Sequence, residues 1–236
     1  MSLHRLSPPI NLAPPPYPIA IRPERIAPRE TELTVQTASE PWHALDYTVS
    51  YEGVTVFTVR GRPWSLTQRR TFFDATGLPL FELRGSWYDS SRLDLRLPGT
   101  RHSILHARLR VEIRAPRAEI IFKNAGVESG VNGPEVKLEV KDHDLDNMVH
   151  VVVLGGRNVA IIQRVTNSRE LTEGQRLPSR FRPKWKARVA AGVDLSLVGF
   201  LSSFPLNQSY QVVHPSLLMG FAAVSCWEIL MSWKSC

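Results

Sequence analysis

Residues 92–114 read RLDLRLPGTRHSILHARLRVEIR, and hydrophobic residues alternate with polar or charged ones on both sides of a Pro98-Gly99 turn signal. Alternate side chains of a β-strand point to opposite faces, so each half of this stretch predicts a strand with one buried and one solvated face. Short strands separated by turn signals, with no amphipathic helix of about 15 residues among them, favour an antiparallel sandwich or barrel over a parallel α/β fold. The same alternation occurs at residues 33–36, 136–141 and 184–189.

The two ends of the chain depart from this pattern. Residues 8–28 contain eight of the 18 prolines, which predicts an extended or irregular arm because proline has no N–H and fixes the backbone. Residues 193–201 are apolar and could begin a helix, but Pro205 interrupts it. Residues 217–233 are apolar almost all round, with Glu228 as the only charged residue, and a helix without a polar face must be buried in protein or lipid. At about 25 Å this helix is slightly short for a bilayer, so the interior of a barrel suits it better.

Positive charge is concentrated in one quarter of the chain. Residues 60–117 hold 12 arginines, no lysine and five acidic residues, an excess equal to the net charge of +7 of the whole chain. The planar guanidinium group binds phosphate through two parallel hydrogen bonds. A basic face of this kind could therefore meet lipid headgroups, nucleic acid or an acidic protein. The alternative is an ordinary solvated outer face of several strands.

Motifs for catalysis or metal binding are not found. The sequence contains no glycine-rich phosphate loop, nucleophile elbow or zinc-protease motif. Its two cysteines, Cys226 and Cys236, exclude a disulfide scaffold and a multi-cysteine zinc site. The densest polar cluster is residues 142–147 with His150; it lacks the spacing of a calcium loop, and we interpret it as a solvated turn. We therefore expect no enzymatic activity, no metal and no cofactor.

Three further residues have structural interpretations. Asp194 follows Gly192-Val193 at the expected start of a helix, where an aspartate accepts backbone N–H groups as an N-cap. Trp64 and Trp87 flank the basic strands and could stack on bases or enter a membrane interface. We favour the interpretation that both fill the core of the sheet.

Residues 54–84 read VTVFTVRGRPWSLTQRRTFFDATGLPLFELR, and this segment resembles the LURP-one-related family. In that family an F-x-V-x-G strand is followed by a second strand and then by a D-a-x-G-x-P-L hairpin. The matching positions here are Phe57, Val59 and Gly61, then residues 65–69, then Asp74, Gly77, Pro79 and Leu80. Residues 189–198, VAAGVDLSLV, resemble the closing V-x-P-G-V-D-x-A-L motif, with Ala191 in place of the usual proline, and residues 156–164 resemble the strand before it.

The resemblance covers roughly residues 19–198 and implies a Tubby C-terminal-like fold, which is also attributed to the phospholipid scramblases. That fold is mainly β: a closed antiparallel β-barrel of about twelve strands around a central hydrophobic C-terminal helix, and closure leaves no exposed strand edge. The expected domains are a proline-rich N-terminal arm at 1–28, the barrel at 29–198, an insertion at 199–219, and a hydrophobic helix completing the barrel at 220–236.

The insertion is inferred from an interruption of the closing helix. Joining Val198 directly to Gly220 would give one uninterrupted apolar helix, so residues 199–219 are consistent with a retained intron or an incorrect gene model. Either of the two apolar segments could fill the barrel as the chain stands. We favour the second, because it is longer and contains no proline.

By analogy of fold, the resemblance implies a non-enzymatic binding or adaptor domain that recognises anionic phospholipid or phosphoinositide headgroups through an arginine-rich face. The alternative is a nucleic-acid-associated or protein-scaffold regulator without lipid binding, although no groove-entering helix or aromatic RNA-binding motif favours nucleic acid. We expect a monomer with a protein partner of unknown identity, located in the cytoplasm and at most peripheral at membranes. The candidate ligand-binding residues are Arg60, Arg62, Arg69, Arg70 and Arg84.

Strand alternation limits this set of candidates. It places Arg60 and Arg62 on one face and the neighbours Arg69 and Arg70 on opposite faces. In a closed barrel, one residue of the second pair must therefore face inward or lie at a bend.

Overall fold

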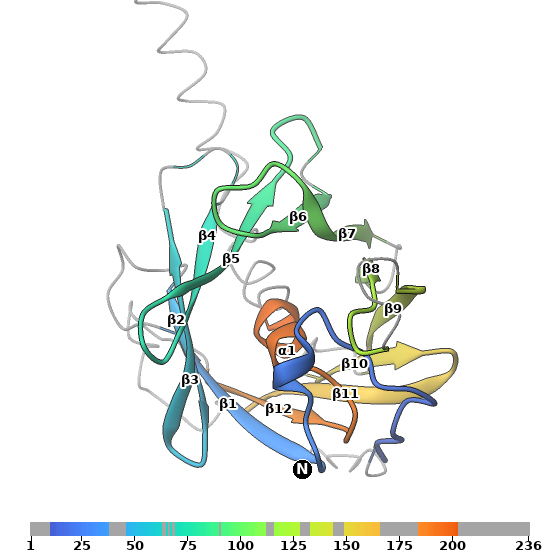
Figure 1. Cartoon of the computed structure of the whole chain (residues 1–236). Helices are drawn as coiled ribbons and strands as arrows, with labels where there is room; N and C mark the ends of the chain where they lie inside the picture. The colour runs from blue at the N-terminus through green and yellow to red at the C-terminus, as the bar shows by residue number, and fades with distance from the viewer. Residues whose placement is uncertain are drawn as a thin grey trace, which may run out of the picture. The chain divides into compact units, whose positions relative to one another are not determined.

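The computed structural model describes residues 10–37, 46–62, 65, 67, 69–89, 91–111, 116–127, 133–143, 149–165 and 184–202. In this part of the chain, twelve strands form a closed antiparallel barrel in which every strand pairs with its neighbours in sequence and the first closes on the last (Figure 1). The expected fold class is confirmed. The strands are β1 (Thr31–Thr37), β2 (Tyr47–Tyr51), β3 (Val54–Gly61), β4 (Arg70–Asp74), β5 (Pro79–Gly85), β6 (Arg92–Arg96), β7 (Ser103–Val111), β8 (Pro116–Lys123), β9 (Glu135–Asp142), β10 (Val149–Leu154), β11 (Arg157–Arg164) and β12 (Lys184–Val189).

Alternating side chains separate the barrel core from the outer surface. In β1, Leu33 and Val35 are fully buried, whereas Glu32 and Gln36, which point to the other face, are exposed. Tight turns join the strands where the sequence contains turn signals. Gly155 and Gly156 link β10 to β11 with φ angles of 54° and 84°, the left-handed conformation that a two-residue hairpin turn requires at both central positions.

The strands of an antiparallel barrel alternate in direction, so the barrel has two distinct ends. We call the end where β12 finishes at Val189 the covered end, and the end where β1 finishes at Thr37 the far end. The covered end is closed by residues 10–28, which the sequence predicts as an arm. In this segment Ile19, Ala20 and Ala27 are almost fully buried, and the segment includes a 3-10 turn, η1 (Pro23–Arg25).

Two buried polar side chains hold this N-terminal segment in place. Asn124 accepts a hydrogen bond from the backbone N–H of Ala20 at 2.9 Å and donates one to the carbonyl of Pro18 at 2.8 Å. Asp194 accepts from the backbone N–H groups of Ile21 at 3.0 Å and Arg22 at 2.8 Å. Residues 18–28 therefore belong to the packed end of the barrel.

A short helix, α1 (Leu195–Leu201), fills the interior of the barrel (Figure 1). Asp194 caps it, because its Oδ1 accepts from the N–H of Ser196 at 2.7 Å, and the N-cap prediction is confirmed. All residues of the helix after Leu195 are buried. Among the described residues, no helix is long and apolar enough to cross a membrane.

This helix comes from the first of the two apolar segments. Residues 199–201, the start of the expected insertion, belong to α1 and are fully or almost fully buried. The expected helix at 220–236 and the rest of the insertion lie outside the described residues. The assignment of residues 220–236 to the barrel interior therefore stays a prediction.

Candidate functional site

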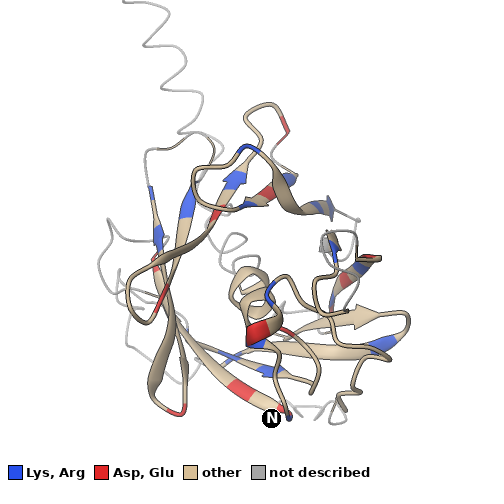
Figure 2. Cartoon of the chain, viewed as in Figure 1, with Lys and Arg blue, Asp and Glu red and all other residues tan. Residues whose placement is uncertain are grey.

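Basic residues, all of them arginines, recur along three neighbouring strands, β5, β6 and β7, which Figure 2 colours by charge. Leu93 and Leu95 of β6 point into the core, so the residues between and beside them point outward. We call this surface, with Arg69 from the segment before β4, the arginine face. Its charged members are Arg69, Glu82, Arg84, Arg92, Asp94, Arg96, Arg108 and Arg110.

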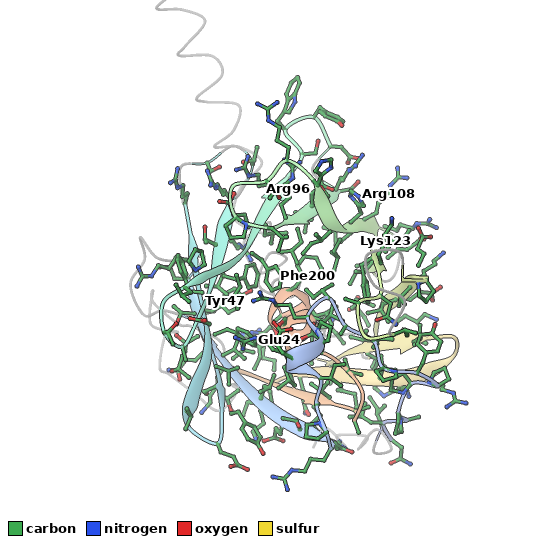
Figure 3. All side chains as sticks on the ribbon, in the orientation of Figure 1. Glu24, Tyr47, Arg96, Arg108, Lys123 and Phe200 are labelled. Carbon is green, nitrogen blue, oxygen red and sulfur yellow. The ribbon has the colours of Figure 1, made fainter. Side chains whose placement is uncertain are left out.

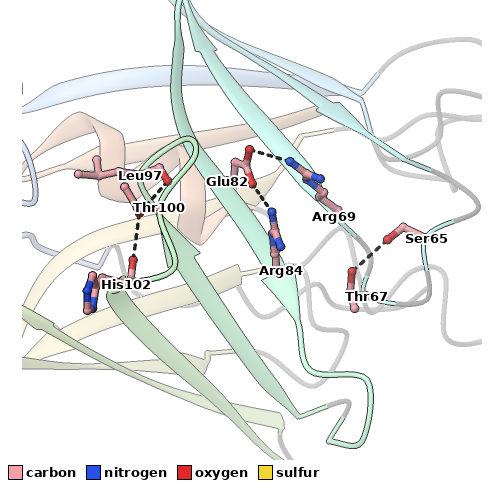
Figure 4. A network of polar contacts seen from close by, with 8 residues as sticks. All are labelled: Ser65, Thr67, Arg69, Glu82, Arg84, Leu97, Thr100 and His102. Atoms are coloured by element: carbon pink, nitrogen blue, oxygen red, sulfur yellow. Dashed lines mark hydrogen bonds and ion pairs between the residues drawn. The ribbon is translucent and has the colours of Figure 1, made fainter.

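Glu82 binds two of the predicted site residues at once. Its Oε1 lies 2.7 Å from Nη2 of Arg69, and its Oε2 lies 2.8 Å from Nη2 of Arg84 (Figure 4). Burial raises the pKa of Glu82, but the hydrogen bonds from Arg84 and Arg69 outweigh it and hold the pKa below its usual value. The three groups together leave a single positive charge on this part of the face.

Asp94 has the same role on the next strand. Its carboxylate lies 3.5 Å from Arg92 Nε, 3.5 Å from Arg96 Nη2 and 2.6 Å from the Nδ1 atom of His106. One carboxylate thus pairs with two arginines, as Glu82 does, and it also contacts a histidine ring. The face keeps an excess of positive charge, while Glu82 and Asp94 hold four of its arginines by ion pairs.

Arg92 and Arg108 stand directly opposite each other in the register of β6 and β7. Both side chains are exposed, and Figure 3 shows Arg108 on the outside of the barrel. Among the described residues, Arg108 forms no ion pair within hydrogen-bonding distance. Two like charges in opposite positions repel each other. Asp94 pairs with Arg92, and Glu119 stands opposite Arg108 in the register of β7 and β8, so nearby carboxylates offset part of this repulsion.

Two further predicted residues, Arg60 and Arg62, are exposed on and just after β3. The guanidinium of Arg60 lies 5.4 Å from the ring centre of Phe73. The backbone of Arg62 makes two hydrogen bonds: its N–H donates to the carbonyl of Arg69 at 2.9 Å, and its carbonyl accepts from the N–H of Ser65 at 3.1 Å. In the described part of the chain neither side chain forms a salt bridge, so both are open to a ligand.

Arg70 does not share this surface. Its side chain is inside the barrel and 1% exposed, which confirms that one residue of the Arg69-Arg70 pair faces inward. There it hydrogen-bonds to Tyr47, whose hydroxyl donates to the carbonyl of Gly199 in α1 at 2.8 Å. Burial raises the pKa of Tyr47, and the charge of Arg70 opposes that effect. Arg70 therefore links the barrel wall to the helix and is unavailable to an outside ligand.

Trp87 corrects the sequence interpretation. It is 80% exposed, and its neighbour Tyr88 is 71% exposed, so Trp87 does not fill the core. Both lie in the turn between β5 and β6, with their rings edge to face at 5.5 Å between centroids. The turn-forming residues around Trp87, in the segment GSWYDSS, are the signal that could have placed it there. Trp64 lies outside the described residues.

The polar cluster at 142–147 also differs from expectation. Asp142 and His150 are buried, and the His150 Nδ1 lies 2.5 Å from the Asp142 Oδ1, so these two residues are not in a solvated turn. The His150 ring packs against Trp185 at 5.8 Å between centroids. The described residues contain no group of three side chains that could hold a metal ion. Residues 144–147 lie outside the described residues.

A closed antiparallel barrel of twelve strands, filled by a short helix and basic on one outer side, defines the class of fold to which this protein belongs. Within that class, the chain belongs to the LURP-one-related family, whose model matches residues 31–201. Membership of this family supports a non-enzymatic domain.

One solved structure similar to this barrel is the X-ray structure of a protein from Arabidopsis thaliana. The TM-score is 0.54 at 16% sequence identity, over 80% of this chain and 97% of that chain. At this identity, the likeness shows the fold alone. No curated protein matches the sequence.

Proposed function

We propose that this barrel is a non-enzymatic binding domain that recognises the phosphate groups of anionic phospholipids or phosphoinositides through the arginine face. The observation that carries the proposal is the pair Arg92 and Arg108, which stand opposite each other with exposed side chains. A phosphate placed between two guanidinium groups accepts hydrogen bonds from both and removes their mutual repulsion.

The carboxylates of the face support the same function. Glu82 and Asp94 each hold two or more cations, which fixes arginine side chains that would otherwise lose conformational freedom on binding. Arg60 lies on β3 and Arg62 just after it, two strands from β5, and both would extend the contact to further headgroups. Each Lys or Arg near an anionic membrane contributes about 1 kcal/mol, and this attraction falls off within about 8 Å at physiological salt.

Co-sedimentation with vesicles tests the proposal. The probes are phosphatidylcholine vesicles without and with phosphatidylserine or a phosphatidylinositol bisphosphate, over a series of salt concentrations. We expect the protein to bind the anionic vesicles only, and binding to weaken as salt rises. In the double variant Arg92→Gln/Arg108→Gln, affinity should fall by about 2 kcal/mol, roughly 30-fold, because two interfacial cations are lost.

A matched control removes the same charge elsewhere. Lys186 and Arg188 of β12 are exposed and pair with Glu32 and Glu30, and β12 is six strands from β6 in the ring. The variant Lys186→Gln/Arg188→Gln should bind anionic vesicles nearly as well as the wild type. Equal losses in both variants, or wild-type binding to neutral vesicles as strong as to anionic ones, would contradict a specific headgroup-binding face. Absence of binding to any vesicle would favour the protein-scaffold alternative.

A further inference from the structure

We propose that the tip of the β5–β6 hairpin inserts into the interfacial region of a membrane, with Trp87 and Tyr88 as the inserting side chains. This inference rests on the proposed function and adds an orientation and a second source of affinity to it. Other exposed large hydrophobic residues in the described part of the chain, such as Val54 and Leu78, stand alone at turns. Single exposed hydrophobic residues are normal on a protein surface, whereas two adjacent aromatic rings that are mostly exposed are not.

The chemistry of the two rings suits the membrane interface. Trp and Tyr are enriched at the level of lipid headgroups, because each has an apolar ring and a polar N–H or O–H group. In the structure the two rings contact each other edge to face rather than the barrel core. Their apolar area would therefore be removed from water only by a partner or a membrane.

Cations surround the base of the hairpin and favour a membrane as that partner. Arg92 begins β6 directly after the turn, and Arg108 stands opposite it. The backbone N–H of Leu109 donates to the carbonyl of Ser91 at 2.7 Å, which fixes β7 against the hairpin. Aromatic residues at a tip with arginines behind them match the order of acyl chains and phosphates in a lipid leaflet. A protein groove for two aromatic rings would not need this positive surround.

The turn is held in shape before any partner binds. Ser86 N–H donates to the carbonyl of Arg92 at 3.0 Å, and Arg92 N–H donates to the carbonyl of Asp89 at 3.0 Å. Ser91 donates to the Asp89 carboxylate through its N–H and its hydroxyl. A turn that is already ordered loses little conformational entropy when it inserts.

Asp89 is the group on the tip that opposes insertion. Hydrogen bonds from Ser91 and the charges of Arg108 and Arg92 hold the pKa of Asp89 below its usual value, so it carries a negative charge close to the anionic surface. Asp89→Asn keeps an oxygen that accepts the Ser91 hydrogen bonds and removes the charge. We therefore expect this variant to bind anionic vesicles several-fold more tightly than the wild type.

Vesicle binding by the full chain tests the role of the rings. We expect Trp87→Ala/Tyr88→Ala to lose about tenfold or more in affinity for anionic vesicles, with the slope of the salt dependence unchanged because the arginines remain. The matched control is Leu78→Ala, which removes an exposed side chain at the β4–β5 turn, at the covered end. Its affinity should equal that of the wild type, and all variants should unfold at nearly the wild-type temperature.

Fluorescence quenching separates insertion from simple proximity. Vesicles containing brominated phosphatidylcholine should quench the tryptophan emission of the wild type clearly more than that of Trp87→Phe. Equal quenching in the two, together with intact salt-dependent binding, would overturn the insertion and assign the aromatic tip to a protein partner, while leaving the headgroup-binding function in place. If the wild type binds no anionic vesicle, the proposed function fails and the insertion fails with it.

Discussion

Tyr47 shows how a single residue connects the strands of the barrel to helix α1 in its interior. It is 2% exposed, and its hydroxyl donates to the carbonyl of Gly199 while Arg70 binds it from β4. Gly199 has no side chain, and a Cβ at this position would lie 3.8 Å from both Phe57 and Phe72. The helix therefore lies within van der Waals reach of the wall at this point, where the Tyr47 hydroxyl also contacts the buried side chain of Arg70.

Replacing this tyrosine tests the link. Tyr47→Phe keeps the ring but leaves the Gly199 carbonyl and Arg70 without the hydroxyl, so we expect a loss of about 1–3 kcal/mol in the free energy of unfolding. Urea unfolding followed by circular dichroism measures it. Tyr51→Phe is the control, because its hydroxyl accepts a hydrogen bond from the exposed side chain of Arg29 at 3.2 Å, and we expect a change below about 0.5 kcal/mol. Equal stability of Tyr47→Phe and the wild type would show that the hydroxyl makes no net contribution.

At the scale of elements, carboxylates connect neighbouring parts of the sheet. Glu82 of β5 holds Arg69, which precedes β4, as well as Arg84 of its own strand. Glu119 of β8 lies 2.7 Å from both Arg110 of β7 and Lys137 of β9. These ion pairs cross strands on the outer surface and keep the cations of the arginine face in register.

Acid should weaken the connection that Glu82 makes. A carboxyl group whose pKa is lowered in the folded state stabilises the fold at pH values above its usual pKa near 4.5, and this contribution is lost as the pH falls through the lowered value. We expect Glu82→Gln to be less stable than the wild type at neutral pH, and this difference to shrink below about pH 4.5. Urea unfolding of both proteins between neutral pH and pH 3 measures it.

The surface pair Arg22–Glu24 provides a control for this series. Its atoms lie 3.0 Å apart and both side chains are substantially exposed, so Glu24→Gln should change stability by less than about 0.5 kcal/mol at neutral pH. A gap between the wild type and Glu82→Gln that stays constant down to pH 3 would contradict the role given to Glu82.

Local pattern was enough to locate strands and turns, but not to orient every residue. The alternation at 136–141 lies inside β9, and the turn signal at 155–156 joins β10 to β11, because both depend on neighbours in sequence. Whether Arg69 or Arg70 faces the interior of the barrel depends on the register of β4 with β3 and β5. The pairing of Asp142 with His150 likewise depends on the alignment of β9 with β10. Trp87 differs from the expectation because tryptophan is usually largely buried, whereas the turn-forming residues around it keep this one on the surface.

At the scale of the whole molecule, the N-terminal segment at residues 10–28 packs against one end of the barrel and closes it. Its backbone forms bridges with residues just before α1, pairing Ile19 with Val193 and Ile26 with Asp194. One carboxylate, Asp194, thus caps the helix and holds the segment. The buried side chain of Asp194 therefore couples the N-terminal segment, which closes one end of the barrel, to helix α1 inside it.

Removing the segment tests this coupling. Deletion of residues 1–28 uncovers the end of the barrel and leaves Asn124 and Asp194 without the backbone groups they bind, so we expect a loss of more than about 3 kcal/mol in the free energy of unfolding. Deletion of residues 1–9 keeps all these contacts and should leave stability unchanged. Thermal and urea unfolding of the two truncated proteins compare them. Equal stability of both would show that the segment is only loosely attached.

The closing contact between β1 and β12 also sets the order in which the barrel can form during synthesis. Thr31 of β1 pairs with Val189 of β12, so β1 cannot form this pairing until almost all of the barrel has left the ribosome. During that time β1 has one unpaired edge, and contacts so distant in sequence form slowly. Newly made chains therefore pass through a stage that favours association with other chains or with chaperones, a stage that the finished ring no longer presents.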